Sequence, residues 1–274
     1  MNNETINLYI ISDSAGDTAL KLAHATMAQF PEAHFYINRR NFVRSEEKLV
    51  RILEEVRDNQ GIILHTIITP TLNTTLEDFC HENSLFQFNL MSSIINELSV
   101  RTGMKPTLEL GAQHHLDENY FKRIKAMEFA AKYDDGKDPK GFEKADLVLL
   151  GVSRTSKTPL SLYLAQKGIR VANLPLVPQA RIPDEIWNVD SKKIVGLTND
   201  PKILNNIRAE RMISYGLDAE TAYSNMENIQ KELDFANDLY EKLNCVVINV
   251  AKLSIEETAS MILDALGLED KTFI

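Results

Sequence analysis

The segment GVSRTSKT at residues 151–158 has the residue types of a phosphate-binding loop. It departs from the pattern G-x-x-x-x-G-K-[ST] at one position, because Ser156 stands where the second glycine is usual. In such loops, backbone N–H groups and the N-terminus of the next helix face an anion. Lys157 could reach a terminal phosphate, Arg154 adds a second cation, and Thr158 has the hydroxyl that such loops place on Mg²⁺. We therefore predict that this segment binds a phosphate or a nucleotide.

A helix cap, a hydrolase and a GTP switch protein are the alternatives for this segment. A helix cap rich in serine and threonine, followed by a surface lysine, would have a similar sequence. GVSRT after a strand also resembles the nucleophile elbow of a hydrolase, in which Ser153 would be the nucleophile. That arrangement needs a later histidine, and all six histidines precede residue 151, which argues against a hydrolase. A GTP switch protein would carry an Asn/Thr-Lys-x-Asp motif, and its absence favours an adenine nucleotide or simple phosphate.

A phosphate-binding loop of this type needs a carboxylate to hold or orient its metal ion. Apolar segments end at Asp13 in YIISD and at Asp200 in KIVGLTND, and KYDDG contributes Asp134 and Asp135. Each of these acids could instead cap a helix or lie in a solvated loop. We predict that Thr158, together with Asp200 or Asp13, holds Mg²⁺.

Strand-like and helix-like segments alternate along the chain, which predicts an α/β fold with mostly parallel sheets flanked by helices. Ser45 is the expected N-cap of one helix, and Gly103 the expected C-cap of another. In the first half, strands are expected at 7–13, 34–38 and 61–68, and helices at 17–30, 45–59, 89–103 and 117–136.

The second half begins with a strand–loop–helix unit of the P-loop type, built around residues 151–158. Arg208 and Arg211 lie three positions apart on a later helix and would clamp phosphate or form surface ion pairs. Ser254 and Glu257 form a capping-box pattern. Strands are expected at 145–150, 169–175, 192–200 and 245–250, and helices at 157–167, 201–212, 219–242 and 254–266.

A polar segment with proline and glycine, KDPKG at 137–141, is the candidate domain boundary. We expect an N-terminal α/β region at 1–138 and a P-loop-containing catalytic α/β region at 139–274, with packing into one compact domain as the alternative. The two regions share a weak internal similarity, since LYIISDSAGDTALKLA and LVLLGVSRTSKTPLSLYLA both read as strand, small-residue loop and helix.

Composition limits the classes of partner. The 274 residues are 44% hydrophobic and 25% charged, with a net charge of −9, which argues against nucleic-acid binding. The two cysteines, Cys80 and Cys245, show no metal-binding spacing, and a reducing cytoplasm fits them. We find no secretion signal and no apolar segment long enough to span a membrane, so a cytoplasmic location without membrane association is expected.

Several motifs together resemble one known family, that of the pyruvate, phosphate dikinase regulatory proteins. VSRTSKTPLSLYLA is followed by GIRVANLPLVP and GLTNDPKILNNIRAERM, and preceded by YFKRIKAMEFAAKYDDG. ISDSAGDTA near the N-terminus is similar to the opening motif of the family. The resemblance runs from about residue 6 to 266, and Ser156 belongs to the family pattern rather than departing from it.

The resemblance implies a bifunctional serine/threonine kinase and phosphorylase. It would phosphorylate a threonine of pyruvate, phosphate dikinase with ADP, which inactivates the dikinase, and remove that phosphate by attack of inorganic phosphate, which releases pyrophosphate. A related branch acts on phosphoenolpyruvate synthase, and we favour the dikinase. The family's nucleotide-binding segment corresponds here to Gly151, Val152, Ser153, Arg154, Thr155, Ser156, Lys157 and Thr158.

The catalytic residues expected from this chemistry are Lys157, which would offset charge on the transferred phosphoryl group, and Asp135 or Asp13, which would accept the threonine proton. Two other classes of function remain open. The chain could be a non-catalytic module that senses ADP or phosphate, or a P-loop kinase of a small molecule. The oligomeric state is not visible in the sequence, and a homodimer is the working assumption.

Overall fold

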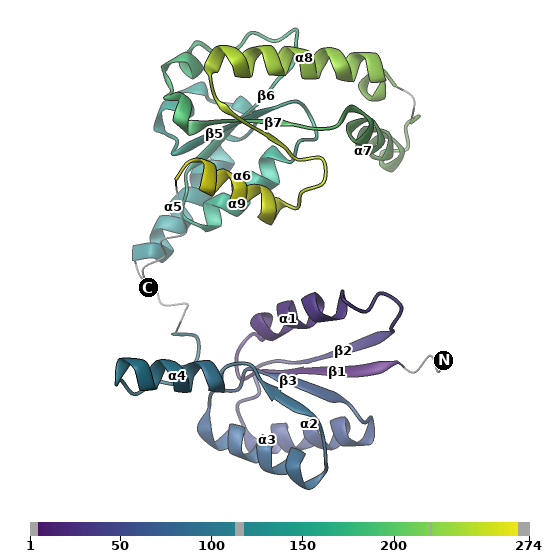
Figure 1. The fold of residues 1–274 in the computed structure, drawn as a ribbon, viewed down its shortest axis with the longest axis vertical. Coiled ribbons are helices and arrows are strands. Elements are labelled where there is room, and N and C mark those ends of the chain that lie inside the picture. The colour runs from purple at the N-terminus through teal and green to yellow at the C-terminus, as the bar shows by residue number, and fades with distance from the viewer. Residues whose placement is uncertain (1–4, 113–117, 220, 268–274) are drawn as a thin grey trace. The chain divides into compact units, whose positions relative to one another are not determined.

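The computed structural model describes residues 5–112, 118–219 and 221–267, which form two compact units, Met1–His115 and Leu116–Ile274 (Figure 1). Each unit contains a four-stranded sheet whose strands all run parallel, with helices on both faces. The predicted α/β class with parallel sheets is therefore confirmed. The division falls before α5 (Glu118–Lys132) rather than after residue 138, because α5 packs on α6 (Lys157–Gln166) of the second unit.

The first unit has strand order β2-β1-β3-β4. After β1 the chain forms β2 on one side and then returns to form β3 on the other side, so a topological switch point lies between β1 and β3. Its elements are β1 (Ile6–Ile11), α1 (Asp17–Met27), β2 (Phe35–Arg40), α2 (Glu46–Asp58), β3 (Ile62–His65), α3 (Pro70–Glu82), β4 (Gln87–Asn89) and α4 (Ser92–Thr102).

Side chains of β1 alternate between two apolar layers, as the pleat of a strand requires. Leu8 and Ile10 pack with α1, whereas Tyr9 and Ile11 pack in a separate cluster with α2 and α3. Figure 1 shows α1 on one face of this sheet and α2 and α3 on the other. The sheet is thus buried on both faces, which is typical of parallel sheets.

The second unit has strand order β6-β5-β7-β8, the same relative order as the first. Its strands and α-helices are α5 (Glu118–Lys132), β5 (Leu147–Gly151), α6 (Lys157–Gln166), β6 (Val171–Pro175), β7 (Ile194–Thr198), α7 (Pro201–Ser214), α8 (Met226–Leu243), β8 (Val246–Asn249) and α9 (Ile255–Ala265). Short 3-10 helices between them are η2 (Asp134–Gly136), η3 (Pro139–Lys144), η4 (Asp184–Asn188), η5 (Ser191–Lys193) and η6 (Ala222–Ser224).

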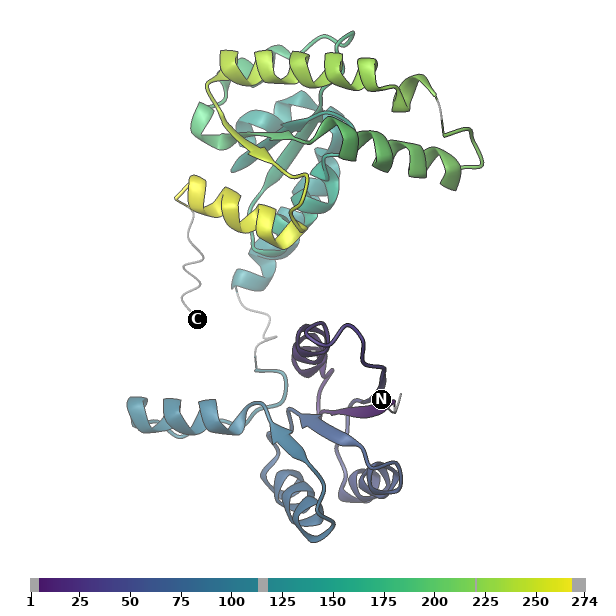
Figure 2. The same cartoon turned by 45° about the vertical axis from the view of Figure 1, so that its right-hand side comes forward.

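Strand β5 is the centre of the second unit, and all five of its residues are buried. Leu147 and Leu149 pack with α6 and α9, while Val148 and Leu150 pack with α7 and α8. Figures 1 and 2 show α8 on one face of the sheet and α6 and α9 on the other. Residues that follow β5 are therefore held at a fixed position on the carboxyl edge of the sheet.

The helix caps predicted from the sequence are confirmed, whereas one predicted helix boundary is wrong and two elements were not predicted. The caps expected at Ser45, Gly103 and Ser254 are present. The helix expected over 117–136 instead ends at Lys132, because Asp135 and Gly136 take left-handed φ values of 54° and 67°. Helix α3 and strand β4 are not among the elements expected from the sequence. No helix in the described part of the chain is both long enough and apolar enough to cross a membrane.

Candidate functional site

The 151–158 loop joins β5 to α6 at the carboxyl edge of the second sheet. Gly151 pairs with Leu197 of β7 and with Pro175 of β6, so the loop leaves the sheet between its two neighbouring strands. The chain passes from β5 to β6 on one side and later to β7 on the other, which makes this the topological switch point of the unit. Ligands of open α/β sheets bind at such points.

The backbone of the loop is shaped to receive an anion. Arg154 and Ser156 have left-handed φ values of 71° and 59°. In the described part of the chain, the backbone N–H groups of residues 153–158 have no protein acceptor, and residue 159 is a proline. Free N–H groups on a backbone that alternates in hand form an anion-binding nest. Ser156 takes the conformation that glycine adopts at low cost in the usual pattern.

Gly151 is required by the close approach of two neighbours. A β-carbon at this position would lie 2.5 Å from the Thr155 hydroxyl oxygen and 3.0 Å from the Leu197 carbonyl oxygen. Thr155 is itself buried and donates to the Val152 carbonyl at 3.0 Å. The chain between Gly151 and Thr155 therefore packs closely against itself and against β7.

Lys157 is 6% exposed, and its Nζ donates to the Val152 carbonyl oxygen at 2.9 Å. Burial lowers the pKa of Lys157 to about 8, and the nearby carboxylates of Asp135 and Asp134 partly oppose this by favouring the charged form. The side chain of Ser156 makes no capping hydrogen bond. The alternative of a serine cap followed by a surface lysine is therefore wrong.

The KYDDG acids lie beside the first turn of α6. Thr158 Oγ1 donates to Asp134 Oδ1 at 2.9 Å, and Asn173 Nδ2 donates to the same oxygen at 2.7 Å. The Asn173 Oδ1 accepts from the Asp135 backbone N–H at 3.1 Å, while the Asp135 side chain is exposed. The structure thus brings Lys157, Thr158 and both acids together, and leaves the Asp135 carboxylate open to a substrate.

Asn173 is a further residue of the site, and the sequence did not single it out. It lies in β6, is fully buried, and links both acids to the sheet. One signal was present, because a single asparagine interrupts the apolar strand VANLP and a buried amide needs partners.

Asp200 and Asp13 have other contacts. Asp200 caps α7 by accepting from the N–H groups of Lys202 and Ile203 at 2.8 and 3.2 Å. Asp13 belongs to the first unit, where its Oδ2 accepts from the Ile68 N–H and from the N–H and hydroxyl of Thr69. Asp200 has no hydrogen bond to the 151–158 loop among the described residues, and the chemical roles predicted for Asp200 and Asp13 stay predictions.

The two arginines of α7, Arg208 and Arg211, have different partners and different exposure. Arg208 is completely buried and forms a two-point ion pair with Glu232, with its NH2 2.6 Å and its NH1 3.1 Å from the two carboxylate oxygens. Arg211 instead contacts Tyr215 on the protein surface. The phosphate clamp considered for this pair is therefore not formed in the structure, and Arg208 is not part of an exposed ion-pairing face either.

A magnesium ion would find oxygen ligands beside the loop. The Thr158 hydroxyl and the Asp134 carboxylate are adjacent, and Mg²⁺ binds through few protein oxygens together with substrate phosphates and water. In the described ranges no group of three or more His, Cys, Asp or Glu side chains is arranged around a common point. The residues present therefore fit a metal held jointly with a phosphate ligand.

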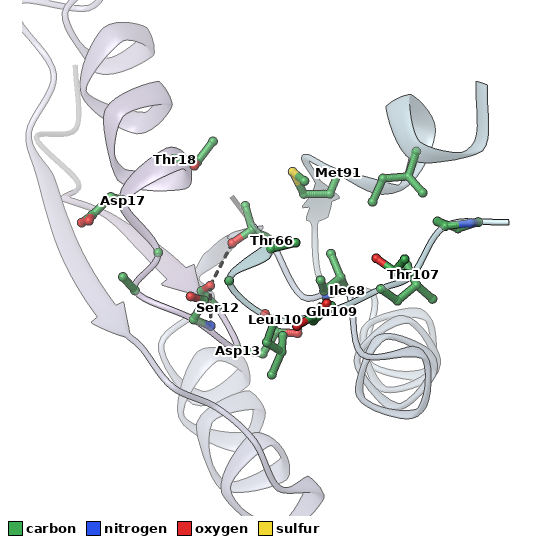
Figure 3. A pocket seen from close by; sticks show the side chains of 18 residues that line it. Ser12, Asp13, Asp17, Thr18, Thr66, Ile68, Met91, Thr107, Glu109 and Leu110 are labelled. Atoms are coloured by element: carbon green, nitrogen blue, oxygen red, sulfur yellow. Dashed lines mark hydrogen bonds between the residues drawn. The ribbon is translucent and has the colours of Figure 1, made fainter. Parts of the chain in front are cut away.

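The first unit has a pocket at its own switch point, with a volume of about 440 Å³ (Figure 3). The loop after β1 forms one wall, where Ser12 Oγ accepts from Thr66 Oγ1 at 3.0 Å and from the Ser14 N–H at 3.1 Å. Gly16 before α1 has a φ of 77°. The two segments that resemble each other in sequence thus occupy equivalent positions in the two units.

Comparison with known proteins gives a match over nearly the whole chain. The model of the kinase/pyrophosphorylase family matches residues 8–263. Two relatives bear the name pyruvate, phosphate dikinase regulatory protein as a provisional assignment. The one from Enterococcus faecalis is 58% identical over 98% of this chain and 97% of its own. The one from Latilactobacillus sakei is 54% identical over 96% of this chain and 94% of its own.

Proposed function

Because the chain belongs to the kinase/pyrophosphorylase family, we propose that it is a bifunctional regulator of pyruvate, phosphate dikinase. It would inactivate the dikinase by phosphorylating a threonine with ADP, and reactivate it by transferring that phosphoryl group to inorganic phosphate. The observation that carries the proposal is the nest of free N–H groups at 153–158, with Lys157 beneath it and the Asp135 carboxylate alongside.

In the kinase direction, the threonine oxygen attacks the β-phosphorus of ADP. The bond from that phosphorus to the bridging oxygen breaks, AMP leaves, and the threonine proton passes to a carboxylate. We assign this proton to Asp135, because its side chain is exposed beside the loop, whereas three donors already occupy one carboxylate oxygen of Asp13. Lys157, Arg154 and the loop N–H groups offset the charge of the transferred phosphoryl group.

In the reverse sense, an oxygen of inorganic phosphate attacks the phosphorus of the phosphothreonine. The phosphorus–threonine oxygen bond breaks, pyrophosphate forms, and the proton carried by the attacking phosphate passes by way of Asp135 to the threonine oxygen. Phosphate needs no deprotonating side chain, since it is already an anion. The same nest can therefore hold either the β-phosphate of ADP or the attacking phosphate. Thr158 and Asp134 would hold a Mg²⁺ ion, which neutralises phosphate charge when it is bound.

A single shared anion site predicts competition. ADP and inorganic phosphate should exclude each other at equilibrium, so each should raise the apparent Kd of the other without limit. Calorimetric titration of ADP at increasing phosphate concentrations measures this directly. Saturable binding of both ligands at once would show two sites, with residues 12–18 of the first unit as the place to look for the second.

The activity itself is tested by incubating the protein with ADP and the dikinase. We expect AMP and a phosphothreonine to appear together, and phosphate to reverse the modification with release of pyrophosphate. Binding of ADP with no AMP would identify a non-catalytic sensor, and AMP formed with a metabolite but no protein would identify a small-molecule kinase. The same assay with phosphoenolpyruvate synthase distinguishes the two protein targets, and the names of the relatives favour the dikinase.

A further inference from the structure

Tyr223 of η6 contacts the 151–158 loop from a position 70 residues later in the chain. Its phenol oxygen lies 2.6 Å from the Ser153 hydroxyl oxygen and accepts from Arg154 Nε at 3.1 Å. Arg154 is exposed, and among the described residues its two terminal guanidinium nitrogens have no acceptor. The tyrosine thus fixes the inner nitrogen of the guanidinium and leaves the outer two nitrogens for a ligand.

Tyr223 is in turn held by the buried Arg208. Arg208 NH1 donates to the Tyr223 carbonyl oxygen at 3.0 Å, and its guanidinium carbon lies 4.5 Å from the centre of the Tyr223 ring. Arg208 NH2 also donates to the Ser153 carbonyl oxygen at 3.2 Å. The ion pair with Glu232 orients the fully buried side chain of Arg208. The backbone and ring of the tyrosine, and the loop beneath it, are therefore fixed by one residue.

Packing alone does not account for this arrangement. An exposed arginine needs no protein partner, because water satisfies its guanidinium, and a flexible side chain loses rotamer entropy when it is held. Arg154 also has the left-handed φ of 71°, which is unfavourable for a residue with a β-carbon. Such arrangements persist where function uses them. A guanidinium held in place before the ligand arrives binds phosphate with a smaller loss of entropy.

We propose that Tyr223 is a positioning residue that orients Arg154 toward the phosphates of the bound nucleotide. The Arg208–Glu232 pair holds Tyr223 for this purpose. The inference rests on the proposed function only in that the ligand is a phosphate compound, and ADP and inorganic phosphate serve as its probes.

The test is a double-mutant cycle on the intact protein, with the Kd for ADP measured by calorimetry. Arg154→Ala should weaken ADP binding by about tenfold or more, and Tyr223→Phe by about three- to tenfold. If the tyrosine acts through the arginine, Tyr223→Phe causes no further loss in the Arg154→Ala background. The Kd for inorganic phosphate should follow the same pattern. Independent losses that multiply would overturn the inference.

Two variants separate positioning from general support of the loop. Arg154→Lys keeps the positive charge but lacks Nε, so Tyr223→Phe should again cause no further loss in that background. Tyr215→Phe is the matched control, since it removes a tyrosine–arginine contact of the same kind on the surface of α7 and should leave the Kd unchanged. If Arg154→Lys leaves the effect of Tyr223→Phe intact, the tyrosine acts on the loop rather than on the arginine, and the inference is wrong.

The outcome also distinguishes this inference from the proposed function. Failure of the wild-type protein to bind either ADP or phosphate would overturn both. ADP binding that is normal in the wild type and unaffected by Arg154→Ala would overturn the positioning role alone. Melting temperatures of all variants, measured without ligand, show whether any loss of affinity comes from unfolding. Within each Arg154 background, the proteins with and without Tyr223→Phe carry the same change in the loop, so their Kd values can be compared directly.

Discussion

At the scale of single residues, the protonation state of Lys157 controls the charge of the site. Its Nζ has the Val152 carbonyl as its hydrogen-bond acceptor and lies in a buried position that disfavours the charged form. A phosphate ligand would supply the negative charge that favours the ammonium form. Binding of ligand and binding of a proton by Lys157 are therefore linked.

This linkage predicts a pH dependence with a definite sign. The pKa of Lys157 is lowered to about 8 in the free protein, so the side chain is charged below pH 8 and loses its charge as pH rises through that value. The phosphate groups of the ligand are already ionised there. The affinity for ADP should therefore fall by only about twofold from pH 7 to 8 and more steeply above it, by up to about tenfold per pH unit. Calorimetry from pH 7 to 9.5 checks this, with the melting temperature as control, and an affinity that rises with pH would contradict it.

Asp135 should affect the chemical step rather than nucleotide binding. Asp135→Asn removes the proton acceptor, so we expect kcat of threonine phosphorylation to fall by about 10²- to 10⁴-fold, with the Kd for ADP changed less than about threefold. Asp238→Asn, an exposed acid of α8, is the matched control. Equal losses in kcat and in ADP affinity would place Asp135 in binding instead, and full activity would return the role of base to Asp13.

The sequence identified several residues of the candidate site from their chemistry, but it did not identify their hydrogen-bond partners. It selected Lys157, Thr158 and the KYDDG acids, since their chemistry is visible in their identity. It paired Thr158 with Asp200 or Asp13, whereas in the structure Thr158 donates directly to Asp134, which also accepts from Asn173. That contact joins residues 24 positions apart, and no local periodicity encodes it.

At the scale of elements, the loop depends on two left-handed residues that are not glycine. Ser156 precedes the first residue of α6 with φ 59° and ψ 23°, and its N–H lies in the nest. The following helix adds the positive end of its dipole to the same site. The position of the loop between β5 and β7 then follows from the sheet order.

Substitution of Ser156 tests the importance of this backbone conformation. Ser156→Gly should bind ADP within about threefold of the wild type and melt at no lower temperature, because glycine adopts a left-handed φ at low cost. Ser156→Val should weaken ADP binding and reduce the free energy of unfolding by about 1–2 kcal/mol, since a β-branched residue is strained there. Equal behaviour of the two variants in thermal melts and titrations would show that the loop does not require this conformation.

Sequence reasoning predicted most elements because their signals are local. Alternating apolar strands and capped helices identified the parallel α/β class and the strand–loop–helix unit. It missed α3, whose first turn has no acidic residue, although Thr69 followed by Pro70 is typical of a helix start. It missed β4, which is only three residues long and has no apolar alternation to detect. It extended the helix of α5 through KYDDG, because a left-handed Asp135 has no simple sequence signature.

At the scale of the whole molecule, two units share one strand order and differ in the loop at the switch point. The loop of the second unit contains Arg154 and Lys157, whereas the corresponding loop of the first contains Asp13 and Asp17. The charges therefore favour phosphate binding in the second unit. The domain boundary expected from the sequence, after residue 138, lies later in the chain than the boundary in the structure, which precedes α5. Both α5 and the KYDDG turn pack within the second unit.

Hydrogen exchange can locate the ligand in the intact chain. ADP should slow amide exchange at residues 153–158 and around 134–136, where N–H groups gain acceptors or lose access to water. We expect the amides of 12–18 to change little. Lys157→Ala, which should not bind ADP, provides the control. Protection confined to the first unit would contradict the assignment of the phosphate site to the second.

The most direct test of the central claim is the activity of Lys157→Ala in both directions. If one anion site at residues 151–158 serves both reactions, the variant should lose ADP-dependent phosphorylation of the dikinase and phosphate-dependent dephosphorylation together. Both are followed in one assay, as AMP and phosphothreonine in one direction and pyrophosphate in the other. Loss of phosphorylation with retained release of pyrophosphate would contradict a shared site.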